Sequence, residues 1–233
     1  MRVLSFDVGT RSLAYCMCLY SNIDTEFQFQ VEQWATVDLL AEGGPASMHV
    51  VSERMVDFLT GFLPGVQVDV VLIENQRGGK FGNATMVTVS HVMQAFYYTR
   101  AKFTAGPHPR VEFYSPTLKV GAAKRLLPDF VPASIKSKRG AAAAAESDAA
   151  ATSSLAEQQQ EQKKNATNYK NNKDVCRAAC VALLPRVASL TLQEAYAACA
   201  KKQQEDRADS LLQAYSFCCP PPQPRAKRAR TLK

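Results

Sequence analysis

The chain has 233 residues, of which 46% are hydrophobic, so it can bury a sizeable core and is not a disordered chain. Its length suits one domain with an insertion, or two small domains. The 28 basic residues exceed the 21 acidic ones, but five of the cations lie in 220–233, so the rest of the chain is nearly neutral and is not a uniformly basic binder.

The first half of the chain predicts strands and helices in alternation. Strands are predicted at 3–8, at 13–20 and at 27–37, where polar and apolar residues alternate. Apolar residues then recur at helical spacing over 48–62. The next apolar run, "VDVVLIE", is typical of a strand buried on both faces, and it ends in Glu74.

The second half predicts mostly helices. A helix over 83–103 is followed by the short strand "VEFYS" and a helix over 117–127. Residues 132–168 are of low complexity, which favours a flexible insertion or a solvated helix. Further helices are predicted in "YKNNKDVCRAACVALLP", in 190–202 and in "EDRADSLLQAYSF", and we expect the Pro-rich basic tail 220–233 to be disordered.

This order of elements predicts an α/β fold with a mixed central sheet flanked by helices. A right-handed crossover would place "VDVVLIE" parallel to the first strand and beside it. Asp7 and Glu74 would then lie at adjacent carboxyl ends of strands, where open α/β sheets form their sites. We expect a single domain over 1–131 and 169–219, interrupted by the insertion 132–168 and followed by the tail 220–233.

The seven cysteines form no C-x-x-C pair, and free thiols in this number favour a reducing, intracellular compartment. Cys176 and Cys180 share a helix face without accompanying histidines, so we interpret them as buried hydrophobic residues. The N-terminal residues show no signal-peptide pattern, and no apolar run reaches the ~20 residues of a membrane span. We therefore expect no association with a membrane.

Four acids stand out by their positions. Asp7 interrupts an apolar run, and a buried carboxylate costs several kcal/mol unless it is paired, caps a turn or binds a metal. Asp206 and Asp209 share one face of the last helix, where the helix dipole alone also favours acids. With Glu74, they would make a cluster of hard oxygen ligands that suits Mg²⁺ or Mn²⁺, and two such ions can hydrolyse a phosphodiester.

Four motifs, "FDVGTRSLAYC", "VLIENQ", "YSPTLK" and "EDRADSLLQAY", resemble in this order those of RuvC-like Holliday junction resolvases. The resemblance is greatest to the group of poxviruses, iridoviruses and other large DNA viruses, which has fungal mitochondrial relatives. It covers almost the whole chain except 132–168 and the tail. The insertion is longer than the usual connection of this family.

The resemblance implies an RNase H-like fold and a Mg²⁺-dependent endonuclease that resolves four-way DNA junctions. Two Mg²⁺ ions per site, for which Mn²⁺ can substitute, would be held by Asp7, Glu74, Asp206 and Asp209. Lys119, after "SP", matches a basic residue near the scissile phosphate. The resemblance also implies a homodimer acting on branched DNA, in the host nucleus or a viral replication compartment.

Polar and basic residues around the acids are candidates for binding DNA. The segment after Glu74 offers hydrogen-bond donors, glycines that permit close approach, and an aromatic ring for wedging between bases. The alternative is a mobile loop with a buried Phe, and the basic stretches further on are alternatively solvated faces. The candidates are Asn75, Gln76, Arg77, Lys80, Phe81, Lys124, Arg125, Lys170 and Lys173.

The helix over 83–103 carries more apolar surface than one sheet contact needs. This surface indicates either ordinary core or a dimer interface, to which Met93, Phe96 or Tyr97 would contribute. The resemblance favours the interface.

Three other functions remain open from the sequence. A nucleic-acid-binding relative without catalysis gains nothing from four acids that repel phosphates. An RNase H would cut the RNA of a hybrid rather than a four-way junction. An actin-like ATPase also begins with "DVGT", but it needs a second Asp-Gly-rich hairpin and a longer chain, and neither is visible.

Overall fold

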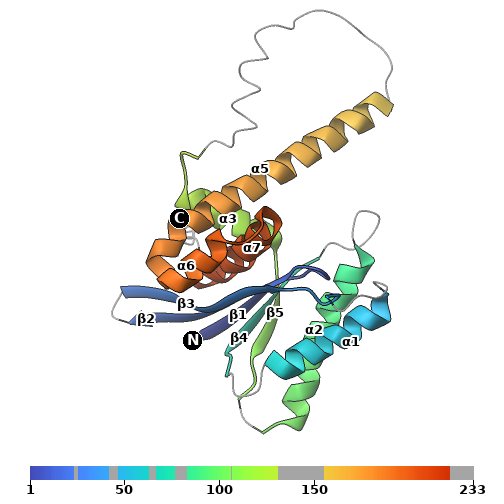
Figure 1. Ribbon diagram of the computed structural model, residues 1–233, viewed down its shortest axis with the longest axis vertical. Helices are drawn as coiled ribbons and strands as arrows, with labels where there is room; N and C mark the ends of the chain where they lie inside the picture. Colours follow the sequence, from blue (N-terminus) through green and yellow to red (C-terminus); the bar gives the residue numbers. More distant parts are fainter. Residues whose placement is uncertain are drawn as a thin grey trace, which may run out of the picture.

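The centre of the molecule is a five-stranded mixed sheet with the strand order β3-β2-β1-β4-β5 (Figure 1). The computed structural model describes residues 1–23, 26–41, 47–62, 67–76, 83–105, 107–130 and 155–220. The strands are β1 (Arg2–Asp7), β2 (Leu13–Ile23), β3 (Glu26–Val37), β4 (Val70–Glu74) and β5 (Arg110–Tyr114).

The register of the sheet fixes where the strand ends lie. β1, β2 and β3 are antiparallel neighbours, whereas β4 pairs in parallel with β1 and with β5. Val3 pairs with Val70 and Phe6 with Ile73, so Asp7 and Glu74 are the next residues along two adjacent parallel strands. The predicted parallel pair is therefore confirmed.

Helices cover both faces of the sheet (Figure 1). One face carries α1 (Met48–Phe62) and α2 (Ala84–Phe103). The other carries the remaining described helices, which are α3 (Pro116–Leu126), α5 (Leu155–Val187), α6 (Leu190–Ala197) and α7 (Lys201–Cys218). The α/β fold class, with helices flanking a mixed sheet, is thus the one that the sequence predicts.

The two faces of the sheet build two cores because side chains alternate along each strand. Val3 and Leu72 pack with Leu211 of α7, in the core beneath α5 and α7. Leu4 and Phe6 pack instead toward α1 and α2. Cys176 and Cys180 are buried in α5, as the sequence predicts, and all seven cysteines are free.

α5 begins much earlier than the sequence indicates. It starts at Leu155, inside the low-complexity segment, so 155–168 is helical. Residues 131–154, with the first part of the predicted insertion, lie outside the described residues, as do 221–233 of the tail. In the described part of the chain, no helix is both long enough and apolar enough to span a membrane.

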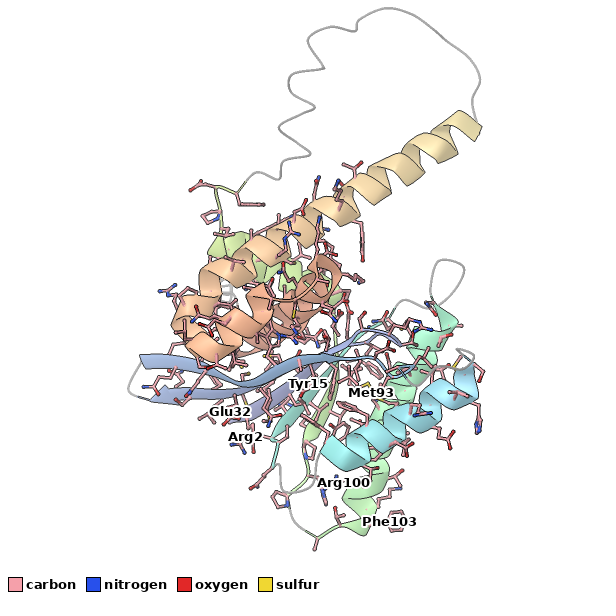
Figure 2. All side chains as sticks on the ribbon, viewed as in Figure 1. Arg2, Tyr15, Glu32, Met93, Arg100 and Phe103 are labelled. Carbon is pink, nitrogen blue, oxygen red and sulfur yellow. The ribbon has the colours of Figure 1, made fainter. Side chains whose placement is uncertain are left out.

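The apolar face of α2 belongs largely to the core. Met93 lies between the helix and the sheet (Figure 2) and is fully buried, and Tyr97 is only 4% exposed. The expectation that Met93 or Tyr97 contributes to a dimer interface is therefore wrong. Phe96 is half-buried and packs against the same core.

Candidate functional site

Four acidic side chains gather where β1 and β4 end against α7. Asp7 and Glu74 are the last residues of the two parallel strands, and Asp206 and Asp209 come from one face of α7. Asp7, Asp206 and Asp209 are each less than 10% exposed. Such burial has a high cost in free energy unless cations compensate the charge.

The turn after β1 needs a glycine. A Cβ atom on Gly9 would lie 2.8 Å from the backbone oxygen of Ser12, which is closer than real contacts allow. Gly9 therefore lets the chain turn tightly from β1 into β2, so that Asp7 stands at the very end of its strand.

Two hydrogen bonds hold α7 against the sheet. The indole Nε1 of Trp34 on β3 donates to the carbonyl oxygen of Arg207 at 2.9 Å. The amide Nε2 of Gln213 donates to the carbonyl oxygen of Phe6 at 3.2 Å. Because Phe6 precedes Asp7 and Gln213 lies one turn after Asp209, the second bond fixes the two acids relative to each other.

The ammonium group of Lys119 lies in the middle of three of the acids. Lys119 is in the first turn of α3 and is 5% exposed. Its Nζ is 2.8 Å from Glu74 Oε1, 3.1 Å from Asp209 Oδ2 and 3.5 Å from Asp7 Oδ1. The resemblance places Lys119 near the scissile phosphate; in the structure its partners are the carboxylates themselves.

Two further lysines neutralise the acids of α7. Lys173 of α5 forms an ion pair with Asp209 and lies 4.0 Å from Asp206 Oδ1. Lys202 Nζ donates to Asp206 Oδ1 at 2.6 Å. Sequence reasoning missed Lys202, although its spacing of four residues from Asp206 on one helix was a signal for this pair.

The protonation of the site follows from its burial. Burial raises the pKa of Asp7 to about 7, and the nearby Glu74 adds to this effect against the attraction of Lys119. Burial alone would also raise the pKa of Glu74, but hydrogen bonding with Asp7 and attraction to Lys119 bring that pKa below its ordinary value. Burial likewise opposes the charge of Lys119, yet the surrounding acids raise its pKa well above the usual range.

The donor set fits a divalent cation, although a lysine lies in its midst. Among the described residues, no group of three Asp, Glu, His or Cys side chains has the geometry of a complete metal site. Asp206 Oδ2 and Asp209 Oδ1 are nevertheless buried without any hydrogen-bond partner. Buried carboxylate oxygens that lack a partner are suitable ligands for a hard cation, and the site supplies both.

The predicted DNA-binding residues have varied surroundings. Asn75 is exposed, and the amide of Gln76 donates to Glu74 Oε2 at 3.1 Å, so Gln76 supports an acid. Lys124 and Arg125 are exposed in the last turn of α3, and Lys170 is exposed on α5, one turn before Lys173. The remaining candidates lie outside the described residues; they are Arg77, Lys80 and Phe81.

The mixed sheet, with its helical layers and acids at the strand ends, is an α/β architecture of the RNase H-like type. It is similar to the yeast mitochondrial Holliday junction resolvase Ydc2, with a TM-score of 0.54 and 15% identity over 93% of this chain and 77% of that one. It is also similar to the fowlpox virus resolvase in complex with its substrate Holliday junction DNA, with a TM-score of 0.53 and 13% identity over 94% and 97% of the two chains.

The structure of the fowlpox virus Holliday junction resolvase gives a TM-score of 0.50 at 13% identity, over 93% of this chain and 96% of that one. The chain matches no family model and no curated protein sequence. Likeness at this level of identity shows the fold, and the RNase H-like fold that the sequence indicates is confirmed.

Proposed function

We propose that the protein is a Mg²⁺-dependent endonuclease that resolves four-way DNA junctions. The observation that carries this proposal is the convergence of Asp7, Glu74 and Asp209 on one point, with Asp206 beside them. The fold supports it, because the fowlpox virus protein with this fold is a resolvase in complex with Holliday junction DNA.

The carboxylates of Asp7, Glu74, Asp206 and Asp209 would hold the metal ions. Two Mg²⁺ ions, or Mn²⁺ in their place, would activate a water molecule and stabilise the leaving oxygen of a phosphodiester. The chain's own task is to hold four ionised acids close together, which requires Asp7 to lose its proton. Lys119 and Lys173 then contribute positive charge beside the bound phosphate.

DNA would approach over exposed cations near the acids. Lys124, Arg125 and Lys170 are exposed on α3 and α5, the helices that also carry Lys119 and Lys173. Cations of this kind bind phosphate oxygens without reading sequence, which suits an enzyme that selects its substrate by shape.

The test of the proposal compares substrates and metal conditions. A labelled four-way junction, a linear duplex and an RNA–DNA hybrid are incubated with the protein in Mg²⁺ or in chelator. We expect the protein to cleave the four-way junction but neither the duplex nor the hybrid, and to do so in Mg²⁺ but not in chelator. Cleavage of only the hybrid would make the protein an RNase H, and junction binding without cleavage in either Mg²⁺ or Mn²⁺ would make it a non-catalytic binder.

Single substitutions assign the site. Asp7→Asn or Asp209→Asn should abolish cleavage while junction binding survives, because these acids hold cations and not DNA. Glu53→Gln is the matched control, since Glu53 is an exposed acid of α1 on the opposite face of the sheet. Near-normal Mg²⁺-dependent cleavage by either aspartate variant would remove that residue from the site.

A further inference from the structure

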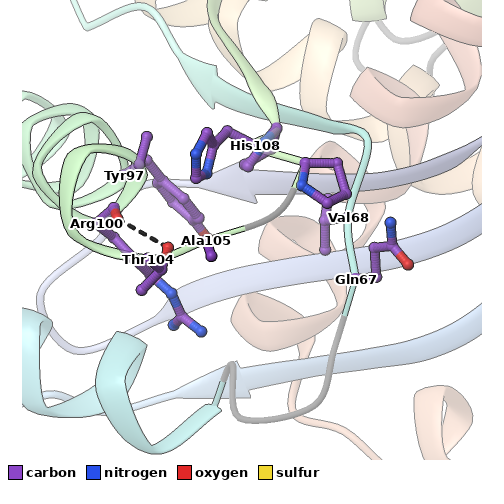
Figure 3. A pocket seen from close by; sticks show the side chains of 10 residues that line it. Gln67, Val68, Tyr97, Arg100, Thr104, Ala105 and His108 are labelled. Carbon is purple, nitrogen blue, oxygen red and sulfur yellow. Dashed lines mark hydrogen bonds between the residues drawn. The ribbon is translucent and has the colours of Figure 1, made fainter.

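A second candidate site lies at the other end of the sheet from the acids. A surface pocket of about 350 Å³ opens between the end of α2 and the segments that lead into β4 and β5 (Figure 3). Asp7 and Glu74 are at the carboxyl ends of their strands, whereas this pocket adjoins the amino ends. Its lining residues are Gln67, Val68, Tyr97, Arg100, Ala101, Thr104, Ala105, Pro107, His108 and Pro109.

The pocket continues the core-facing side of α2. Met93 and Tyr97 on this side pack against the sheet, but the next turns of the helix extend beyond it and carry Arg100 and Thr104 into the pocket wall. A guanidinium group therefore occupies a position where the pattern of the helix calls for an apolar side chain.

The polar groups of the pocket are not used up by the protein itself. Within the described residues, the guanidinium of Arg100 makes no hydrogen bond or ion pair. The backbone carbonyl oxygen of Arg100 accepts from Thr104 N at 3.0 Å and from Thr104 Oγ1 at 2.9 Å. The hydroxyl of Tyr97 is buried and without a partner. Burial raises the pKa of this phenol, so it remains a hydrogen-bond donor at neutral pH.

The charges around the pocket favour an anion. None of the described side chains that line it is acidic, and His108 adds an imidazole at its rim. Asp69 is the acid nearest in sequence to the lining residue Val68. Its carboxylate already accepts a hydrogen bond from the backbone N–H of Arg2 at 2.6 Å. Lys102 is exposed in the same last turn of α2 and supplies the cation that a helix carboxyl end favours, so Arg100 is not needed for that purpose.

We propose that this pocket binds a small molecule that carries one phosphate or carboxylate group on an apolar or planar body. The fork of Arg100 and the hydroxyl of Tyr97 hold the oxyanion, since a guanidinium matches both anions in a bidentate manner. Val68, Ala101 and Pro107 contact the body of the ligand. The volume of the pocket lies in the range of small-molecule sites.

The experiment measures binding calorimetrically on the full chain, in chelator so that no metal holds the probe elsewhere. Phenyl phosphate and benzoate are the two anionic probes, and benzyl alcohol is their neutral counterpart. We expect at least one anion to bind and the alcohol not to bind. Binding of neither anion, or equal binding of the alcohol, would overturn the proposal.

Variants locate the bound probe. Arg100→Gln should weaken binding at least tenfold, and Tyr97→Phe should weaken it severalfold, because each removes one partner of the oxyanion. Lys102→Gln is the matched control and should bind as the parent protein does. Unchanged affinity in Arg100→Gln would overturn the assignment.

The same variants separate this pocket from the proposed nuclease site. Arg100→Gln should cut a four-way junction at the rate of the parent protein, because Arg100 lies at the other end of the sheet. The Asp7→Asn variant should bind the same anion as the parent protein, with the same affinity. Loss of anion binding in Asp7→Asn but not in Arg100→Gln would place the anion among the catalytic lysines and overturn the proposal.

Discussion

At the scale of single residues, Lys119 serves as the internal counterion of the site. Its ammonium group is within 3.5 Å of oxygens from three carboxylates, all of them largely buried. Removing one partner of a buried ion pair leaves the other charges uncompensated, and such a loss costs about 3–5 kcal/mol. A divalent cation bound to these carboxylates would neutralise the same negative charges that Lys119 neutralises.

We therefore predict that Lys119→Met destabilises the metal-free protein by about 3 kcal/mol, and that Mg²⁺ stabilises this variant more than it stabilises the parent. Urea denaturation with Mg²⁺ and with chelator measures both effects. Lys124→Met, an exposed cation of the same helix, is the control and should change little. Equal stabilisation of variant and parent by Mg²⁺ would contradict the prediction.

Asp7 gives a prediction about pH. Its pKa is about 7 in the folded protein, against an ordinary value of 3.8, because burial disfavours the charged form. An acid with a raised folded-state pKa keeps its proton in the folded protein at pH values where the unfolded chain has already lost it. The folded protein is therefore most stable at low pH, and this stability is lost as pH rises to the folded-state pKa. Without metal, stability should thus fall as pH rises from about 4 and level off above about 7, with on the order of 2 kcal/mol lost between about pH 5 and pH 7.

The measurement is a series of denaturation curves across this pH range in chelator. Asp7→Asn should remove the fall, since the amide has no proton to lose. Mg²⁺ should reduce the fall in the parent protein, because it favours the ionised carboxylate. A fall of the same size in Asp7→Asn would assign the effect to another group.

At the scale of elements, α7 determines the geometry of the site. It carries two of the four acids, and the bond from Gln213 to Phe6 ties it to β1. Gln213→Leu keeps the size of the side chain but removes this buried hydrogen bond, which costs about 0.5–1.5 kcal/mol. We predict a lower kcat for junction cleavage with little change in KM, because the acids shift relative to one another while the DNA-binding surface stays.

Gln213→Glu is a useful second variant, since it keeps the shape but loses the amide donor. Both variants should lower kcat and raise the Mg²⁺ concentration needed for half-maximal rate. Ser216→Ala, on the same helix, is the control for general weakening, because Ser216 is bonded to Tyr114 and not to β1. Variants with lost stability but unchanged kcat and Mg²⁺ dependence would limit Gln213 to a structural role.

Elements with a clear pattern of burial could be predicted from the sequence, and the others could not. The apolar spacing over 48–62 corresponds to α1, and the run ending at Glu74 is a buried parallel strand. The sequence left 155–168 open between a flexible insertion and a helix because this stretch has no apolar stripe; its Ala, Glu, Gln and Lys residues favour a helix by propensity alone.

Contacts between side chains of elements far apart in the sequence could not be predicted either. The four acids could be named from their positions, because strand ends and helix faces follow from spacing. The placement of Lys119 among them depends on how α3 packs on the strand ends, which no local pattern gives. The apolar face of α2 was ambiguous for a similar reason, since core and interface residues share the same composition.

At the scale of the whole molecule, the proposed substrate has a symmetry that a single chain lacks. A four-way junction is resolved only when two opposing strands are cut, and the part of each chain that the structure describes has one such set of acids. A two-fold dimer would present two such sites through a self-complementary interface. On α2, His91, Ala95, Tyr98 and Lys102 are exposed at helical spacing and form a surface stripe, in which the His91 ring contacts Phe113 of β5.

We predict a homodimer that includes this stripe of α2. Tyr98→Glu should yield a monomer, because Tyr98 is 51% exposed and a charge would be buried in the interface. Glu53→Gln on α1 is the control and should remain a dimer. Sedimentation at micromolar concentration measures the assembly, and circular dichroism verifies that the variant is folded.

The dimer also predicts how the junction is cut. When parent protein is mixed with an excess of Asp7→Asn, most active sites are paired with inactive ones, so junctions should be nicked on one strand instead of resolved. A supercoiled cruciform plasmid distinguishes the two products, since paired incision within one binding event linearises it and a single incision relaxes it. A strict monomer that still linearises the plasmid in one binding event would refute the dimer, whereas a dimer unaffected by Tyr98→Glu would place the interface on another face.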